Sequence, residues 1–340
     1  MSMSTIRKRD ILALIAVVAI LLAMIPTMVL AADQDDLTGE YTLGNTAPTV
    51  DNVTLYKTDN TTTGTMIPET EFVVKVTVTD TNTLKDLDNV TVTIYYDADG
   101  DYGNGSPPTS GNAQTCGIIT CSSSDNWSTA AVWTTDFGTS GRWTRSVDSA
   151  IPTDMALSTG TFEFHFIPGA VSTMTDGISR WHIYATAYDG TDTAANYQAG
   201  LLMAWYGELV INSLTKVTWT SPTAGMSDKA AADNVSVTYI ANGTYNSKVA
   251  ATGAWNGATL VTDSSALGSK QFRIKAYYND TPGSAQIVQS YSTYSGSIYS
   301  AGQTTESGTT IDTNKLWLSL GSPFPNGTYS GTIYYKISNT

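Results

Sequence analysis

The amino-acid sequence predicts an all-β protein, with two tandem antiparallel β-sandwiches that follow an N-terminal apolar segment. Short runs of alternating apolar and polar residues recur along the chain, separated by clusters of Gly, Pro, Asn and Asp. Of the 30 acidic residues 24 are Asp, which favours turns, and only 6 are Glu, which favours helix interiors. The length of 340 residues corresponds to about two domains, and a hydrophobic fraction of 41% supplies a core for each.

Residues 1–32 have the pattern of a secretory signal peptide. Basic residues at positions 7–9 precede the apolar run Ile11–Ile25, and Pro26 then ends the helical pattern. The sequence Val29-Leu30-Ala31 matches the small-x-small cleavage motif, so we expect the mature chain to begin near Ala32.

Two alternative interpretations of this leader stay open. An uncleaved membrane anchor is possible because the stretch Ile11–Ala32 has 22 residues and a spanning helix needs about 20. A pilin-type leader cut near Arg9-Asp10 would leave the apolar segment as a filament helix, although Pro26 counts against it. Under each of the three interpretations, the chain is exported.

The next segment, residues 33–48, is acidic and then Gly-containing, and we expect a flexible tail. The first sandwich is expected over residues 49–207. Its strands should include four runs with one apolar face, at Phe72–Val78, Val90–Tyr96, Phe162–Phe166 and Trp181–Ala187.

The second sandwich is expected over residues 208–340, with the boundary near Gly207. Its alternating runs are Val217–Trp219, Val235–Tyr239, Phe272–Ala276, Leu316–Leu320 and Thr328–Ile337. Because no long linker separates the two halves, we expect the domains to touch.

Several segments resemble the immunoglobulin-like or cadherin-like domains of archaeal secreted cell-surface proteins. They are Ala47–Val53, Val74–Thr79, Val90–Asp101 and Trp181–Asp189 in the first half, and Trp219–Pro222 and Asn234–Asn242 in the second. The resemblance implies two tandem immunoglobulin-like antiparallel β-sandwiches with a structural role at the cell envelope. The resemblance identifies no catalytic residues in this chain.

The formal net charge of −13 makes nucleic acid and anionic lipid poor partners. No second long apolar stretch follows the leader, so we expect membrane contact only through residues 1–32 if these are not cleaved. The expected location is extracellular or at the cell surface.

Asp97, Asp99 and Asp101 have the one-three-five spacing that directs alternate carboxylates toward a hard cation, and Asn104 could add an oxygen. The EF-hand pattern fails, because Tyr102 replaces the required Gly and Pro108 the bidentate Glu. The alternatives are a weak calcium site and a solvated Asp-Gly turn. Calcium is the one cofactor that the sequence suggests.

Cys116 and Cys121 lie in a segment dense in Gly, Ser and Pro. In an exported chain the two cysteines are expected to form a disulfide that closes a short loop. Half of a metal site is the alternative, but two further ligands are missing nearby.

Nine Asn-x-Ser/Thr sequons are candidates for glycosylation, and most of them fall at predicted turns. They are Asn52, Asn60, Asn89, Asn104, Asn126, Asn234, Asn242, Asn279 and Asn326.

No motif in the sequence indicates a catalytic function. His165 and His182 are the only histidines, and both are expected on solvated strand faces without a ligand partner at metal-binding spacing. The G-x-S-x-G elbow and the H-E-x-x-H pair are absent from the sequence. Trp127, Trp133 and Trp143 could form a sugar-binding platform, but we expect them to fill the core.

The sequence therefore predicts a non-enzymatic structural or adhesive protein of the cell surface, either associated with a surface layer or a filament-type (pilus-like) subunit. Its expected partners are other copies of itself, envelope proteins or glycans. A secreted carbohydrate-binding module is the alternative, and an exported hydrolase is the third possibility.

Overall fold

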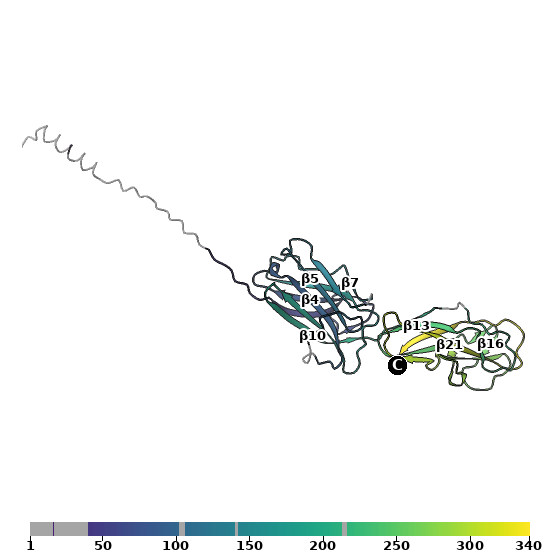
Figure 1. Cartoon of the computed structure of the whole chain (residues 1–340). Helices are drawn as coiled ribbons and strands as arrows, with labels where there is room; N and C mark the ends of the chain where they lie inside the picture. Colours follow the sequence, from purple (N-terminus) through teal and green to yellow (C-terminus); the bar gives the residue numbers. More distant parts are fainter. Residues whose placement is uncertain (1–15, 17–39, 102–105, 140–141, 213–215) are drawn as a thin grey trace, which may run out of the picture. The chain divides into compact units, whose positions relative to one another are not determined.

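The computed structural model describes residue 16 and residues 40–101, 106–139, 142–212 and 216–340 (Figure 1). The chain divides into two compact units, Met1–Gly44 and Asn45–Thr340. The expected leader 1–32 and the first part of the expected tail 33–48 lie outside the described residues, apart from Ala16. Within the described part of the chain, no helix combines the length and the apolar character needed to cross a membrane.

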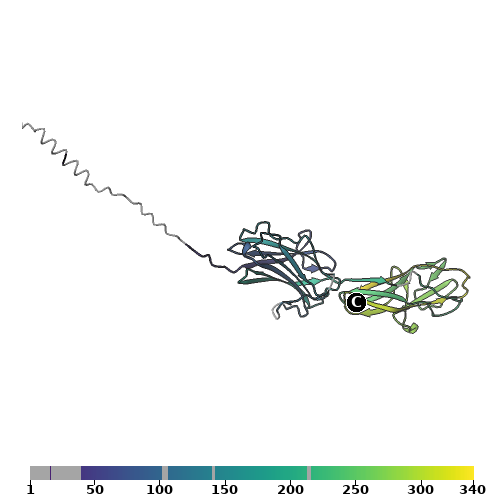
Figure 2. The same cartoon turned by 45° about the horizontal axis from the view of Figure 1, so that its top comes forward.

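The unit Asn45–Thr340 is built from β-strands, which confirms the predicted all-β class. Its strands form several sheets, joined by turns and by the single-turn 3₁₀ helices Leu84–Asp86 and Pro282–Ser284. Strands β4, β5, β7 and β10 gather in one body, coloured purple to teal, and β13, β16 and β21 in another, coloured green (Figures 1 and 2).

Two sheets make up the N-terminal body. One has the order β1-β3-β8-β7 and the other the order β2-β10-β9-β4-β5-β6. The first comprises β1 (Thr49–Lys57), β3 (Phe72–Thr79), β8 (Thr159–Ile167) and β7 (Thr144–Arg145), and all its pairings are antiparallel. The second comprises β2 (Thr65–Met66), β10 (Thr193–Met203), β9 (Arg180–Tyr188), β4 (Asn89–Asp97), β5 (Cys116–Ser122) and β6 (Val132–Asp136).

The inner faces of these two sheets form one hydrophobic core. Phe162, Phe164 and Phe166 alternate along β8 and are fully buried, as the period-two pattern predicts. They pack in the same cluster as Trp181 and Ile183 of β9, which belongs to the opposite sheet. Such burial of about 1.5–3 kcal/mol for each large apolar side chain is the main stabilising contribution of this fold.

Two further sheets make up the C-terminal body. The larger one has the order β11-β13-β21-β17-β16-β15, with β12 paired to β21 and β18 to β17. Its strands are β11 (Gly207–Ile211), β13 (Val235–Ala241), β21 (Thr309–Leu320), β17 (Gln271–Tyr277), β16 (Ala258–Leu260), β15 (Ala254–Trp255), β12 (Lys229–Ala230) and β18 (Gln286–Ile287).

In the smaller sheet, β14 (Tyr245–Ala251) is central. It pairs with β22 (Ile333–Asn339) along one edge and with β20 (Tyr299–Ala301) and β19 (Gln289–Ser290) along the other. Val237 and Tyr239 of β13 and Val249 of β14 are buried in a second core cluster. The first core extends to Met203, and Trp205 already packs against the second.

Residues on the two sides of the boundary at Gly44 and Asn45 differ in their contacts with the first body. Asn45 Nδ2 donates to Asp189 Oδ2 at 2.9 Å, and the Thr46 backbone N–H donates to Asn82 Oδ1 at 2.9 Å. The expected tail is therefore bound to the first body from Asn45 onward. In contrast, Tyr41 is 90% and Leu43 74% exposed.

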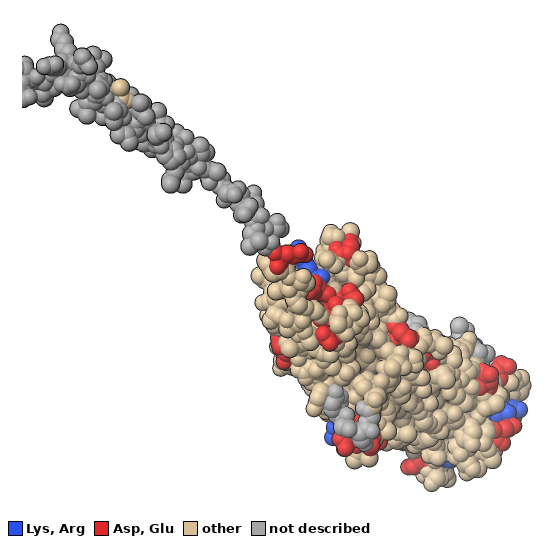
Figure 3. All heavy atoms as spheres, turned by 60° about the vertical axis from the view of Figure 1, so that its left-hand side comes forward, with Lys and Arg blue, Asp and Glu red and all other residues tan. Residues whose placement is uncertain are grey.

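The surface carries the charge imbalance of the sequence. On the face shown in Figure 3, acidic side chains are spread over much of the surface and basic ones are few. This follows from the 30 acidic and 17 basic residues of the chain.

Candidate functional site

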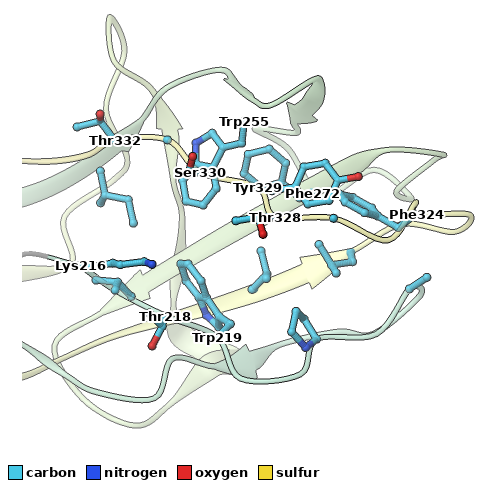
Figure 4. Close-up of a pocket in the computed structure, with 18 of the residues that line it drawn as sticks. Lys216, Thr218, Trp219, Trp255, Phe272, Phe324, Thr328, Tyr329, Ser330 and Thr332 are labelled. Atoms are coloured by element: carbon cyan, nitrogen blue, oxygen red, sulfur yellow. The ribbon is translucent and has the colours of Figure 1, made fainter.

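An open cavity of about 810 Å³ lies in the C-terminal body (Figure 4). One wall is the extended segment Lys216–Trp219 and the other is the segment Phe324–Ile333. These walls are more than 100 residues apart in sequence, so the cavity exists only in the folded chain. A cavity of this size is in the range of ligand-binding pockets.

Hydrogen bonds to backbone carbonyls fix both walls. The Ala232 N–H donates to Thr218 O at 2.8 Å, which holds the first wall. The Thr252 N–H donates to Thr332 O at 3.0 Å, and Asn256 Nδ2 donates to Thr328 O at 2.9 Å, which hold the second. The cavity is thus a preformed feature of the fold.

Aromatic side chains dominate the lining. The Trp219 and Trp255 ring centroids are 6.2 Å apart, and Trp255 lies 5.0 Å from Phe272. Phe324 and Tyr329 meet edge to face at 4.9 Å, and Figure 4 shows them beside Phe272 and Trp255, across the cavity from Trp219. Gly331 allows the second wall to approach closely, because a Cβ atom there would lie 2.1 Å from Trp255 Nε1.

Buried donors without an acceptor distinguish this cavity from the first core. Trp219 Nε1, Trp255 Nε1 and Tyr335 Oη are buried and have no hydrogen-bond partner among the described residues. In the first body, the indoles of Trp127, Trp143 and Trp181 donate to backbone carbonyls at 2.7, 2.9 and 2.8 Å. Unpaired buried donors are costly, and an acceptor brought into the cavity would remove that cost.

The side of the sandwich that carries the cavity also carries two edge strands. In the described part, β11 pairs only with β13 and β22 only with β14. The two strands contact each other across the gap between their sheets. Ile211 of β11 and Ile333 of β22 both line the cavity, so its occupant would meet two rows of backbone donors and acceptors.

Among the described residues that line the cavity, Lys216 alone is charged, and none is Asp, Glu, His or Cys. Burial raises the pKa of Tyr335 above its ordinary value, so its hydroxyl remains a neutral donor. The described lining therefore offers aromatic rings, hydroxyl groups and one ammonium group for contact with an occupant.

The structure does not gather the three carboxylates of the predicted calcium site. Asp97 Oδ1 accepts the Asp99 N–H at 3.2 Å, and Asp99 Oδ1 accepts the Asp101 N–H at 3.1 Å, as in successive Asx turns. Asp97 Oδ2 lies 3.7 Å from His182 Nε2. Asn104 lies outside the described residues.

A different group meets the distance requirement for a metal ion. Glu71, Asp148 and His165 bring one ligand atom each to within 4.8 Å of one another. His165 Nδ1 is 3.1 Å from Glu71 Oε1, and Glu163, which pairs with Lys75 at 2.7 Å, lies beside it. The sequence offers His165 no ligand partner at a metal-binding spacing, and strand pairing brings Glu71 to it from a distant part of the chain.

The expectation that His182 is solvated is wrong. Its side chain is buried, and its ring lies 5.4 Å from the Tyr95 ring. Burial lowers the pKa of His182, and the nearby Asp97 and Asp99 oppose that shift.

The predicted disulfide does not form. Both cysteines are free and buried, and they lie five residues apart on the same strand, β5. This spacing puts their Cα atoms about 16 Å apart with side chains on opposite faces, whereas a disulfide needs about 4.4–6.8 Å. Cys121 packs in the core, and Cys116 lies opposite Tyr95 on the other face. Burial raises the pKa of each thiol to about 12.

The prediction that Asn242 is a glycosylation site is wrong. It is fully buried, so it cannot carry a glycan in the folded protein. Exposed sequon residues are Asn52, Asn60, Asn126, Asn234 and Asn326, whereas Asn89 and Asn279 are half-buried.

The aromatic residues that sequence analysis considered as a sugar platform fill the first body instead. Trp127 and Trp143 belong to its core, and Trp133 packs against it. The cavity residues Trp219, Trp255 and Tyr329 were not singled out, and only the density of aromatic residues in the second half could have pointed to them.

Comparisons with known proteins leave the family open. No family model matches the chain, and no curated protein matches it. Among solved structures, the dimeric latent form of PorU from Porphyromonas gingivalis aligns at 12% identity with a TM-score of 0.13. That alignment covers 86% of this chain and 33% of the other, so the chain spans about a third of the length of PorU.

Proposed function

We propose that this chain is an exported, non-catalytic structural or adhesive protein of a cell surface that works by association with copies of itself or with other envelope components. The observation that carries the proposal is the open cavity between the edge strands β11 and β22. Exposed strand edges beside an apolar cavity favour docking of another polypeptide segment by strand addition.

The strand orders support the immunoglobulin-like class for both bodies. In that fold, one sheet has the order A-B-E-D and the other G-F-C, with C′ and C″ added in the variable type. The orders β1-β3-β8-β7 and β10-β9-β4-β5-β6 of the first body match these two series in sheet order and in chain order. The order β11-β13-β21-β17 of the second matches A-B-E-D, and β14 and β22 match C and F.

The predicted leader supports export, and the acidic surface with its exposed sequons is typical of secreted proteins. The fold could equally serve other roles, so the proposal depends on the edge strands and the cavity and not on the fold class.

Electron microscopy and sedimentation of the protein recovered from its native cells test this function. We expect it in an envelope or filament fraction as regular assemblies. Protein that stays monomeric at every concentration, in the presence of the other envelope components, would contradict it.

Carbohydrate binding is the second candidate, favoured by the paired Trp219 and Trp255 rings and their unpaired indole N–H groups. Sugar platforms usually expose their rings, whereas Trp255 is only 7% exposed. A glycan array read out by Trp fluorescence distinguishes this candidate from the first.

A further inference from the structure

The two bodies differ in one strand position, and the difference lies at the cavity. In the first body, β9 is covered along its outer edge by β10. In the second, the corresponding strand β22 pairs with β14 on one side, and no described strand covers its other edge. The cavity occupies the place where a strand equivalent to β10 would contribute to the core.

The first body shows what such a strand supplies. Leu201 and Met203 of β10, two residues apart, are 2% and 1% exposed and belong to the first core. In the second body the matching space is the aromatic cavity with the unpaired donors Trp219 Nε1 and Tyr335 Oη. A strand inserted there would supply two apolar side chains on one face and backbone carbonyls as acceptors.

The segment Glu40–Gly44 has the side chains that such an inserted strand would need. Tyr41 and Leu43 are two residues apart, so an extended backbone points them to the same face. They are 90% and 74% exposed and lie in the part of the chain that precedes the compact unit. Glu40 adds a negative charge, and Lys216 places a positive charge in the described lining of the cavity.

The segment cannot reach the cavity of its own chain. It is attached at Asn45 to Asp189, in the turn before β10, whereas the connection to the second body follows the far end of β10. The 11 residues of β10 extend over about 33 Å, and five residues span at most about 18 Å. This segment can therefore serve as a donor only to another molecule.

We propose that the segment Glu40–Gly44 of one copy inserts beside β22 of a second copy, with Tyr41 and Leu43 in the aromatic cavity. This inference rests on the proposed function and specifies its contact. Because donor and acceptor are different surfaces, the contact is head-to-tail and repeats from copy to copy. The product is a filament or an open chain of subunits.

Paired variants of the full chain test the assignment. Tyr41→Asp/Leu43→Asp blocks the donor, and Thr42→Asp places a charge on the opposite face of the same segment as a control. Ile211→Asp/Lys216→Glu blocks the acceptor at exposed positions that do not threaten folding, and Val210→Asp alters an exposed neighbour that does not line the cavity. Circular dichroism confirms that each variant is folded.

Light scattering measures the assembly of each variant over a concentration series. Both blocked variants should need at least about tenfold more protein to assemble, and both controls should behave as the unmodified chain. A mixture of the two blocked variants should form dimers and nothing larger, because it contains one working donor and one working acceptor.

Three outcomes overturn the assignment. Assemblies that persist in both blocked variants refute the donor segment but leave the proposed function standing. An unmodified chain that never assembles refutes the proposed function together with this contact. The third outcome is a change in Trp fluorescence with oligosaccharides but not with a synthetic peptide of residues 38–46. It would show that the cavity binds a sugar and not the segment.

Discussion

Arg142 and Glu208 form an ion pair in which the Arg142 Nη2 atom lies 2.7 Å from Glu208 Oε1. Arg142 precedes β7 of the first body and Glu208 lies on β11 of the second. Glu69 and Glu306 lie 3.7 Å from the same guanidinium, and the Tyr206 hydroxyl donates to Glu208 at 2.7 Å. One cation therefore lies among three carboxylates where the two bodies join and offsets part of their mutual repulsion.

Replacing this cation should loosen the junction. Arg142→Ala leaves the carboxylates Glu69, Glu208 and Glu306 near one another without compensation, and we expect a loss of about 1–2 kcal/mol of unfolding free energy. The value is modest because both partners of the main ion pair are about one-third exposed. Thermal unfolding in low salt measures it. The loss should shrink at 1 M NaCl, and an equal loss at both salt concentrations would refute the electrostatic origin.

Asn242 should be essential for the same junction. Its Nδ2 donates to Ser172 O at 2.9 Å and to Ala204 O at 2.8 Å, and its Oδ1 accepts the Tyr206 N–H at 2.7 Å. Asn242→Ala leaves these groups buried without their partner, so we expect a loss of about 2–4 kcal/mol. Asn234→Ala removes an exposed sequon and should cost less than about 0.5 kcal/mol. Denaturant unfolding compares the two, and peptide mapping should find no glycan on Asn242.

How far the sequence predicts this fold depends on the range of the interactions involved. Alternation along Phe162–Phe166 is local, so the strand and its buried face are predicted correctly. The positions of Cys116 and Cys121 depend on the pairing of β5 with β4, which a segment rich in Gly and Ser does not reveal. The cavity depends on segments near Trp219 and Tyr329, which only sheet order brings together. A pattern within one strand is visible in sequence, whereas contacts between distant strands are not.

The two thiols should be unreactive in the folded protein. Both are buried, and with a pKa of about 12 the thiolate fraction at pH 8 is about one in ten thousand. We expect no labelling by a maleimide in native buffer and two labels in denaturant. The mass measured without reductant should equal that of the dithiol. A mass lower by two hydrogens would show that the two cysteines form a disulfide.

His182 should make the protein less stable in mild acid. Because its pKa in the folded state is lowered below the ordinary 6.5, the unfolded chain takes up the proton first as the pH falls. The stability is fully present above pH 6.5 and declines as the pH falls toward the folded-state pKa. The free energy of unfolding between pH 7.5 and 5 should show this slope, and His182→Gln should reduce it. A variant with an unchanged slope would assign the acid sensitivity to other groups.

Metal addition should distinguish the two groups of possible ligands. A nitrogen and two carboxylates close together suit Zn²⁺ or Mn²⁺, and Glu71, Asp148 and His165 provide them. In the Asp97 loop, the Asp97 and Asp99 side-chain oxygens instead accept backbone N–H groups of their own loop. We expect Zn²⁺ to raise the unfolding temperature of the unmodified chain and of Asp97→Asn by a similar amount, and to leave His165→Asn unchanged. Asp97→Asn removes one negative charge and His165→Asn removes none, so non-specific attraction to an acidic surface would weaken the effect of Zn²⁺ in Asp97→Asn and keep it in His165→Asn. EDTA should reverse the increase. If His165→Asn keeps the increase and Asp97→Asn loses it, the metal binds at the Asp97 loop and the assignment to His165 is wrong.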